Sequence, residues 1–200
     1  MKLVVSGEEF HFEFGESTVQ VLIDKMFEEA EQHELVFSHV TIDGIDVYEN
    51  IEEYVREHFE SIEHIEMKFI TVDELVGGIL QSTNEYVERA IPELYALSEE
   101  CYQSPGTTTW GKLQQLIEGI QWLEQTAVFL EKNRDNPLSS QIDTSLFSFS
   151  NEVLIMGEAI EGQDFILLGD IIQYEIIPKF ESILHNLNNS VREDQAHDFS

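Results

Sequence analysis

The sequence predicts an α+β protein in which a small strand-containing unit precedes an antiparallel bundle of about four helices. Before Thr71, several short runs alternate apolar and polar residues, which is the pattern of half-buried β-strands. From Val72 onward the apolar residues recur every three or four positions instead, as they do along one face of an α-helix. We therefore expect a first domain over 1–71, a helical bundle over 72–190 and a frayed tail over 191–200.

The first domain carries the signals of several strands and two helices. Asp43-Gly44 is a strong signal for a two-residue hairpin turn, because both residue types tolerate a positive φ. Ser17 or Thr18 can cap the helix that follows them. The expected elements, in order, are a hairpin over 2–14, a helix over 17–27, a strand pair over 36–47, a short helix over 51–59 and a final strand over 62–70.

This order of elements resembles the ubiquitin-like β-grasp fold, in which a helix packs across a mixed sheet. The resemblance covers residues 1–71 and rests on element order and length, so it implies a fold and no activity. A second resemblance lies in the segment Asp170–Pro178, written DIIQYEIIP. Its D-x-x-x-Y-E-x-x-P pattern makes the chain similar to uncharacterised bacterial helical proteins of unknown function.

Apolar stripes predict the helices of the second half. The segment 107–109 consists of threonines, which are good cap residues before the second helix. The polar segment 133–144 is the longest between helices, and we expect a mobile loop there. Pro92 and Pro178 lie inside stripes, where each removes a backbone N–H, so we expect a kink at both. The stripes run over 72–98, 110–130, 145–161 and 165–187.

The pair Gly77-Gly78 follows the β-grasp-like segment and raises the alternative of a conjugation tail. The pair lies inside an uninterrupted apolar stripe with patterned helices after it, which argues against a free tail. Each glycine costs a helix interior about 1 kcal/mol relative to alanine. We therefore predict that two backbones approach closely at this pair, with a hinge between the two halves as the second alternative.

The chain is strongly acidic. It carries 40 acidic and 10 basic residues among 200, a formal net charge of −30. The excess is spread along the chain, with 18 acidic and 4 basic residues in 1–72 and 22 and 6 in 73–200. Such a charge repels phosphate backbones and anionic lipids, so we expect neither nucleic-acid nor membrane binding. Basic proteins and cations are compatible with it.

Several features argue against catalysis. Cys101 is the single cysteine, so an internal disulfide and a cysteine metal site are excluded, and we expect a partly buried structural thiol. No G-x-S-x-G elbow and no complete G-x-x-x-x-G-K-[ST] phosphate loop occur, so we name no catalytic residue and no cofactor. Met1 leads directly into a strand pattern without a secretory leader, and no apolar run has the length of a membrane span, so we expect a cytoplasmic protein.

The segment Asp170–Pro178 supplies the candidate site. By α-helical spacing, Asp170 and Tyr174 share one side of the helix, whereas Glu175 falls on another side with apolar residues. In the first interpretation these side chains and Pro178 lock two helices together around a proline kink. In the second they form part of a groove for a partner or ligand.

We therefore predict a non-enzymatic, acidic protein–protein interaction module or adaptor that engages a basic partner. The alternative is a metal- or small-molecule-binding protein that uses carboxylates together with His58 or His64. Homodimer formation through an apolar face of the bundle is a further expectation, because the helices carry more aromatic surface than they obviously bury. The residues concerned are Trp110, Trp122, Phe147 and Phe149.

Overall fold

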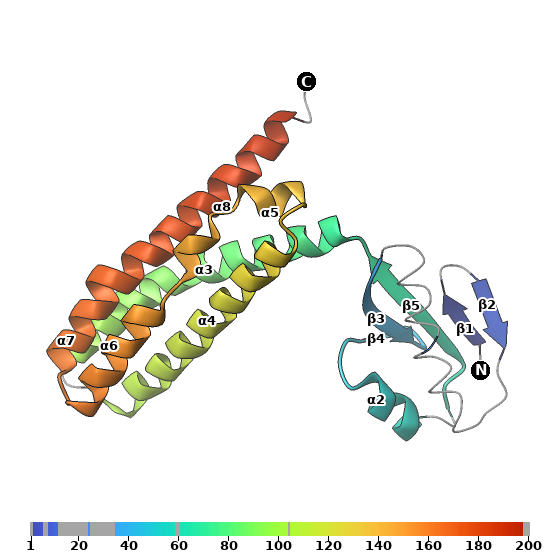
Figure 1. Ribbon diagram of the computed structural model, residues 1–200. Helices are drawn as coiled ribbons and strands as arrows, with labels where there is room; N and C mark the ends of the chain where they lie inside the picture. The colour runs from blue at the N-terminus through green and yellow to red at the C-terminus, as the bar shows by residue number, and fades with distance from the viewer. Residues whose placement is uncertain are drawn as a thin grey trace. The chain divides into compact units, whose positions relative to one another are not determined.

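The computed structural model describes residues 2–5, 8–11, 24, 35–58, 61–103 and 105–197. The chain divides into two units, Met1–Leu75 and Val76–Ser200. The described strands all belong to the first unit, and helices with short connections make up the second (Figure 1). The predicted α+β class, with strands before helices, is confirmed. The helix predicted over 17–27 lies outside the described residues, apart from position 24.

The described residues of the first unit form a mixed sheet. β1 pairs parallel with β5, whereas the β1–β2, β3–β4 and β3–β5 pairs are antiparallel. The strands are β1 (Lys2–Val5), β2 (Glu8–His11), β3 (Val36–Ile42), β4 (Ile45–Val47) and β5 (His64–Ile70), in the spatial order β2-β1-β5-β3-β4. The short helix α2 spans Ile51–His58. The predicted strand pair, short helix and final strand are therefore all present.

The turn between β3 and β4 is the Asp-Gly turn that the sequence predicts. Asp43 has φ 47° and Gly44 has φ 86°, and two positive φ angles are the requirement of a type I′ hairpin turn. The Asp43 carboxylate also accepts a hydrogen bond from the backbone N–H of His64 at 2.7 Å, and the Asp43 N–H donates to the His64 carbonyl at 3.0 Å. The turn is thereby fastened to the start of β5.

The core of the first unit lies on one face of β3 and β5. Alternation places every second side chain of a strand on the same face. Val55 of α2 packs into the same cluster, and the partly buried Phe37 and Phe69 border it with ring centroids 5.9 Å apart. The buried members are Val40, Ile42, Val47, Val55, Ile62, Ile65 and Met67.

The second unit is built from the helical stripes that the sequence predicts. Its elements are α3 (Val72–Tyr102), α4 (Thr107–Lys132), α5 (Pro137–Gln141), the 3₁₀ turn η1 (Thr144–Phe147), α6 (Ser150–Glu161), α7 (Phe165–Ile171), the π-helical turn η2 (Ile172–Ile176) and α8 (Ile177–His197). Pro92 lies within α3, which continues through it as an α-helix. The α8 helix extends to His197, past position 191, where the sequence predicts that the tail begins to fray. In the described residues, every helix is too short or too polar to span a bilayer.

The long helices of the second unit pack antiparallel. Between α3 and α4, the Tyr86 and Trp122 rings meet edge to face at 5.4 Å, and the Lys112 ammonium pairs with Glu100 at 2.6 Å. Tyr86 precedes Glu100 in α3, whereas its partner Trp122 follows Lys112 in α4. This reversed order is the mark of antiparallel helices. The ring of Phe180 in α8 lies 6.3 Å from the Tyr86 ring, so α8 packs on the same stretch of α3.

Two of the four aromatic residues assigned to a dimer face belong to the core instead. Phe147 and Phe149 are fully buried, and the Phe149 ring packs against Phe180 with centroids 5.6 Å apart. Trp110 and Trp122 remain 40% and 36% exposed. The prediction that the helices leave all four partly uncovered is therefore wrong for the two phenylalanines, because η1 and the connection before α6 direct them between α4 and α8.

The predicted close backbone approach at Gly77-Gly78 is also wrong. Both glycines lie inside α3, and a Cβ atom added at either would meet nothing within 4 Å. Close approaches occur at other glycines. A Cβ at Gly119 would lie 1.6 Å from the Tyr86 hydroxyl, and one at Gly169 would lie 2.8 Å from the Tyr102 ring. Sequence position alone did not distinguish the glycines that face a neighbour from those that face open space.

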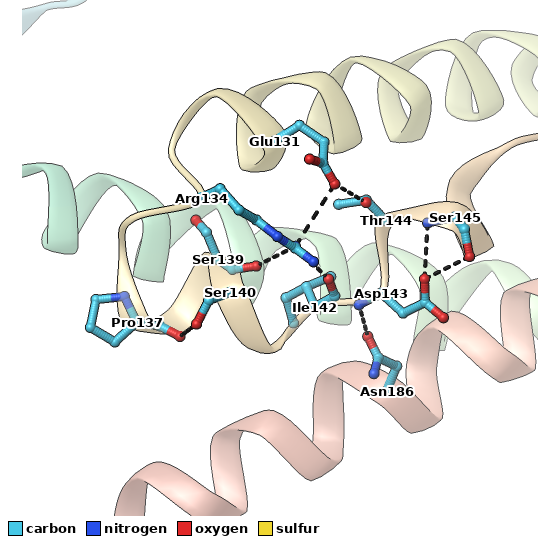
Figure 2. A network of polar contacts seen from close by, with 10 residues as sticks. All are labelled: Glu131, Arg134, Pro137, Ser139, Ser140, Ile142, Asp143, Thr144, Ser145 and Asn186. Carbon is cyan, nitrogen blue, oxygen red and sulfur yellow. Dashed lines mark hydrogen bonds and ion pairs between the residues drawn. The ribbon is translucent and has the colours of Figure 1, made fainter.

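The polar segment after α4 is structured, so the prediction of a mobile loop over 133–144 is wrong. Asn136 caps α5 by accepting hydrogen bonds from the N–H groups of Leu138 and Ser139 at 3.0 and 3.3 Å, and Pro137 occupies the first helical position. The Arg134 guanidinium donates to the Ser139 carbonyl at 2.9 Å, as Figure 2 shows. The Asn136 cap and the hydrogen bonds of Arg134 give this segment a defined structure, which its polar composition did not indicate.

Candidate functional site

The segment between α7 and α8 departs from α-helical geometry in front of Pro178. A proline inside a helix lacks the N–H that would bond to the carbonyl four residues earlier, and its ring crowds that carbonyl. Here the carbonyl belongs to Tyr174, and η2 surrounds it with a π-helical turn in which the Ile177 N–H donates to the Ile172 carbonyl. The proline effect that the sequence predicts therefore takes the form of a widened turn. Such π turns occur frequently at functional sites.

The three polar residues named from the sequence, Asp170, Tyr174 and Glu175, lie along the end of α7 and the π turn η2. The cavity-lining residues of this stretch stand at positions 167, 170, 171, 174 and 175, which is the three-to-four spacing of residues along a helix. Asp170, Tyr174 and Glu175 accordingly line the same cavity. The cavity therefore takes in both sides that the sequence predicts, Asp170 with Tyr174 on one and Glu175 with Ile171 on the other.

We call this space the α6–α7 cavity. It measures about 380 Å³ and lies between α6 and the segment formed by α7 and η2. Its size falls within the range of sites that take a side chain or a small ligand. Residues that line it include Asn151, Glu152, Leu167, Asp170, Tyr174 and Glu175.

Glu152 is the residue of this cavity that sequence reasoning missed. It is only 7% exposed, and its Oε1 atom pairs with the Lys179 ammonium at 2.8 Å. The ammonium also donates to the Ser148 carbonyl at 2.7 Å and lies 5.3 Å from the centre of the Phe149 ring. The Oε2 atom of Glu152 is buried and has no hydrogen-bond partner in the described part of the chain. A buried carboxylate oxygen without a donor is an acceptor that still lacks its partner.

Asp170 joins the cavity to α3. Its Oδ1 atom accepts a hydrogen bond of 2.6 Å from the Tyr102 hydroxyl, which also contacts the Gln173 amide oxygen at 3.3 Å. This bond to Asp170, with help from burial and from nearby negative charge, raises the pKa of Tyr102 to about 12. The hydrogen bond between Asp170 and Tyr102 links α7 to α3, as the helix-lock interpretation requires. Tyr102 was not named from the sequence. A glycine at position 169, beside the acidic residue, is the signal that could have pointed to an aromatic neighbour.

The surroundings of the cavity combine charge with exposed apolar surface. Tyr174 is 64% exposed, and Leu167 is also partly exposed at the cavity wall. Leu154 of α6 and Ile166 of α7 are exposed on the same two helices. Pro178 is not a lining residue; its carbonyl accepts a hydrogen bond from the Ser182 hydroxyl at 2.8 Å within α8. Its contribution is the shape of the turn that precedes it.

The histidines named for a metal site have other contacts. The Nδ1 atom of His58 lies 3.0 Å from the Tyr54 carbonyl, and its ring stacks on Tyr54 at 4.4 Å. His64 begins β5, where its backbone is bonded to Asp43. Across the described residues, no group of three or more histidine, cysteine, aspartate or glutamate side chains is arranged to hold a metal ion.

Cys101 is a buried thiol in the last turns of α3. Burial, reinforced by the negative charge of Glu100, raises its pKa to about 11. The thiolate is the reactive form of cysteine, and a raised pKa keeps the group protonated near neutral pH. The thiol is in the environment expected of a structural cysteine.

Comparison with known proteins gives one family. Residues 78–186 match the family described as Domain of unknown function (DUF8042). The match begins in α3 and ends in α8, so it contains every residue of the α6–α7 cavity. No curated protein and no solved structure matches the chain.

Proposed function

Because the chain belongs to the family described as Domain of unknown function (DUF8042), which names no activity, we propose its function from the geometry of the α6–α7 cavity. The protein is a non-enzymatic interaction module that binds a basic segment of a protein partner at this cavity. The observation that carries the proposal is the gathering of three carboxylates, those of Glu152, Asp170 and Glu175, around one space.

The chemistry of the cavity supports a cationic occupant. Lys179 neutralises one oxygen of Glu152, and the other oxygen lacks a donor in the described residues. Asp170 and Glu175 add two further negative groups at the same cavity. A lysine ammonium or an arginine guanidinium supplies both the charge and the several donors that such a site requires.

The form of the partner follows from the apolar residues on the same helices. Leu154, Ile166, Leu167 and Tyr174 are exposed large side chains of α6, α7 and η2. An amphipathic helix can place apolar residues against such a surface while a basic residue enters the cavity. The net charge of −30 speeds the encounter with a basic segment, because opposite charges steer association.

The first unit is a ubiquitin-like β-grasp in this proposal. Support comes from its mixed sheet, in which β1 pairs parallel with β5 and antiparallel with β2. The fold would give the module a second surface at the edge strand β4, where Ile45 and the following Tyr48 are both largely exposed. Edge strands of this kind can pair with an extended peptide.

The proposal is tested with a short amphipathic helical peptide whose polar face carries lysine and arginine, compared with the same peptide carrying glutamine. We expect the basic peptide to bind and the affinity to fall as salt rises. The double variant Asp170→Asn/Glu175→Gln should weaken binding by about tenfold, because each exposed charge contributes about 0.5–1 kcal/mol. Isothermal titration calorimetry measures both effects.

The matched control is Glu158→Gln/Glu161→Gln. These acidic residues are exposed on α6 and do not line the cavity, so the control removes the same amount of charge from a neighbouring helix. An equal loss of affinity in the two double variants would show a general charge effect and would overturn the assignment of the site. Tight binding of the glutamine peptide would contradict the basic partner.

A further inference from the structure

A second cavity lies at the α5 end of the helical unit, away from the residues of the α6–α7 cavity. It measures about 420 Å³ and is formed by α3, α5 and α8. Most of its wall is apolar. The lining residues that matter below are Gly77, Leu80, Asn84, Leu138, Ile142 and Leu187. We call it the α5 cavity.

The α5 wall of this cavity is held in place by polar contacts. Figure 2 shows Arg134 bonded to the carbonyls of Ser139 and Ile142, at 2.9 and 2.8 Å. Asn186 of α8 accepts a hydrogen bond of 3.0 Å from the Asp143 N–H, which ties the end of this segment to α8. Leu138 and Ile142 are therefore fixed before any ligand arrives, as is usual for small-molecule sites.

Gly77 keeps part of the cavity open. A Cβ atom built on it would meet nothing within 4 Å, so no neighbour in the described residues requires a glycine there. A glycine inside a helix nevertheless costs about 1 kcal/mol relative to alanine. Gly78 is equally unobstructed but is not a lining residue. The pair therefore contains one glycine that borders the cavity and one that does not.

The polar groups of the wall define the ligand. The Oδ1 atom of Asn84 is buried and has no hydrogen-bond partner among the described residues, so it is an acceptor that lacks a donor. The Glu85 carboxylate belongs to the same wall, and the net charge of −30 repels anions. We propose that the α5 cavity binds a neutral, mainly apolar small molecule that carries one hydrogen-bond donor, placed toward Asn84.

Indole and 1-methylindole are suitable probes, because they differ in a single N–H donor. Titration of the full chain, followed by two-dimensional NMR of backbone amides, should shift the amides around Leu80, Leu138 and Leu187. We expect indole to bind about three- to tenfold more tightly than 1-methylindole, the range that one neutral hydrogen bond contributes. In Asn84→Leu the two probes should bind equally.

The glycine pair supplies the matched variants. Gly77→Leu places a side chain at the cavity and should reduce indole affinity at least about tenfold, since bulk then occupies the ligand volume. Gly78→Leu makes the same change in helix propensity one position away and should leave the affinity unchanged. Circular dichroism of each variant verifies that the helices are retained.

Three results would overturn the proposal. Amide shifts of equal size at the α3–α4 surface around Leu94 and Leu116 would mean that indole adheres to apolar surface in general. Equal affinities of Gly77→Leu and Gly78→Leu would place the probe elsewhere. If the wild-type protein binds 1-methylindole more tightly than indole, or binds neither probe, the proposal of a ligand that carries a hydrogen-bond donor is wrong. None of these results bears on peptide binding at the α6–α7 cavity, because the two cavities share no residue.

Discussion

Asp170 is a residue that serves the fold and the candidate site together. Its Oδ1 atom receives the Tyr102 hydroxyl from α3, and its side chain also lines the α6–α7 cavity. Gly169 makes this possible, because a Cβ atom at that position would lie only 2.8 Å from the Tyr102 ring. The helix lock and the partner groove, which the sequence presents as alternatives, are compatible at this residue.

We expect Tyr102→Phe to lower the free energy of unfolding by about 0.5–1.5 kcal/mol, since it removes one hydrogen bond and keeps the ring. The pKa of Tyr102 is raised from 10.0 to about 12, so the neutral form is favoured in the folded state. Its contribution is therefore complete below pH 10 and is lost as the pH rises toward 12. Urea unfolding across this window should show the wild type and the variant converging.

Tyr174→Phe is the control for this prediction. It removes a hydroxyl from a tyrosine that lines the α6–α7 cavity and is 64% exposed. We expect little change in stability from it, because an exposed hydroxyl exchanges its hydrogen bonds with water. A gap between wild type and Tyr102→Phe that stays constant through the alkaline window would contradict the role given to the bond with Asp170.

The helices of the second unit differ in how closely neighbouring side chains approach their glycines. Gly78 of α3 faces open space, whereas Gly119 of α4 lies under the Tyr86 hydroxyl. Burial raises the pKa of that hydroxyl, in agreement with its position between helices. The same residue type thus costs helix stability at one position and permits helix packing at the other.

Alanine substitution at these two positions should have opposite effects. Gly78→Ala should raise the free energy of unfolding by about 0.5–1 kcal/mol through helix propensity. Gly119→Ala should lower it by about 1–3 kcal/mol, because its Cβ would overlap Tyr86 and force the ring to move. Urea unfolding of each variant at neutral pH measures the change. A stabilising Gly119→Ala, or a destabilising Gly78→Ala, would show that the α3 and α4 packing described above is wrong.

Charge is the property that acts on the whole molecule. The acidic excess is present in both halves of the sequence, and a net charge of −30 on 200 residues repels itself when the chain is compact. The described ion pairs use few of the carboxylates; Lys179–Glu152 is the one with the least exposed acid. Stability should therefore depend on screening more than on individual pairs.

We expect the melting temperature to rise as ionic strength increases from low to moderate values, because salt screens the repulsion between carboxylates. Sodium chloride and choline chloride should act equally at the same ionic strength, since screening does not depend on the identity of the cation. Differential scanning calorimetry gives the measurement. A fall in melting temperature with salt would mean that attractive pairs dominate. A much larger rise with sodium would indicate a specific cation site.

Much of the fold could be predicted from local patterns. The alternation in β3 and β5, the Asp43-Gly44 turn and the three-to-four spacing from Val72 onward identified the elements, because each pattern reports a local backbone geometry or one buried face. Local patterns gave a wrong prediction for the segment 133–144. Its order depends on the Asn136 cap and on Arg134, whose acceptors can be recognised only once the chain has turned.

Sequence alone determined the class of the protein, its charge, and three of the cavity's residues, since Asp170, Tyr174 and Glu175 stand within one short segment. Only the tertiary structure decided that Glu152 joins them, that Tyr102 holds Asp170, and that all of them line one cavity. The physical reason is that periodicity describes a regular helix taken by itself. Packing brings α6 and α3 to this segment, and the spacing of residues within one helix does not report its neighbours.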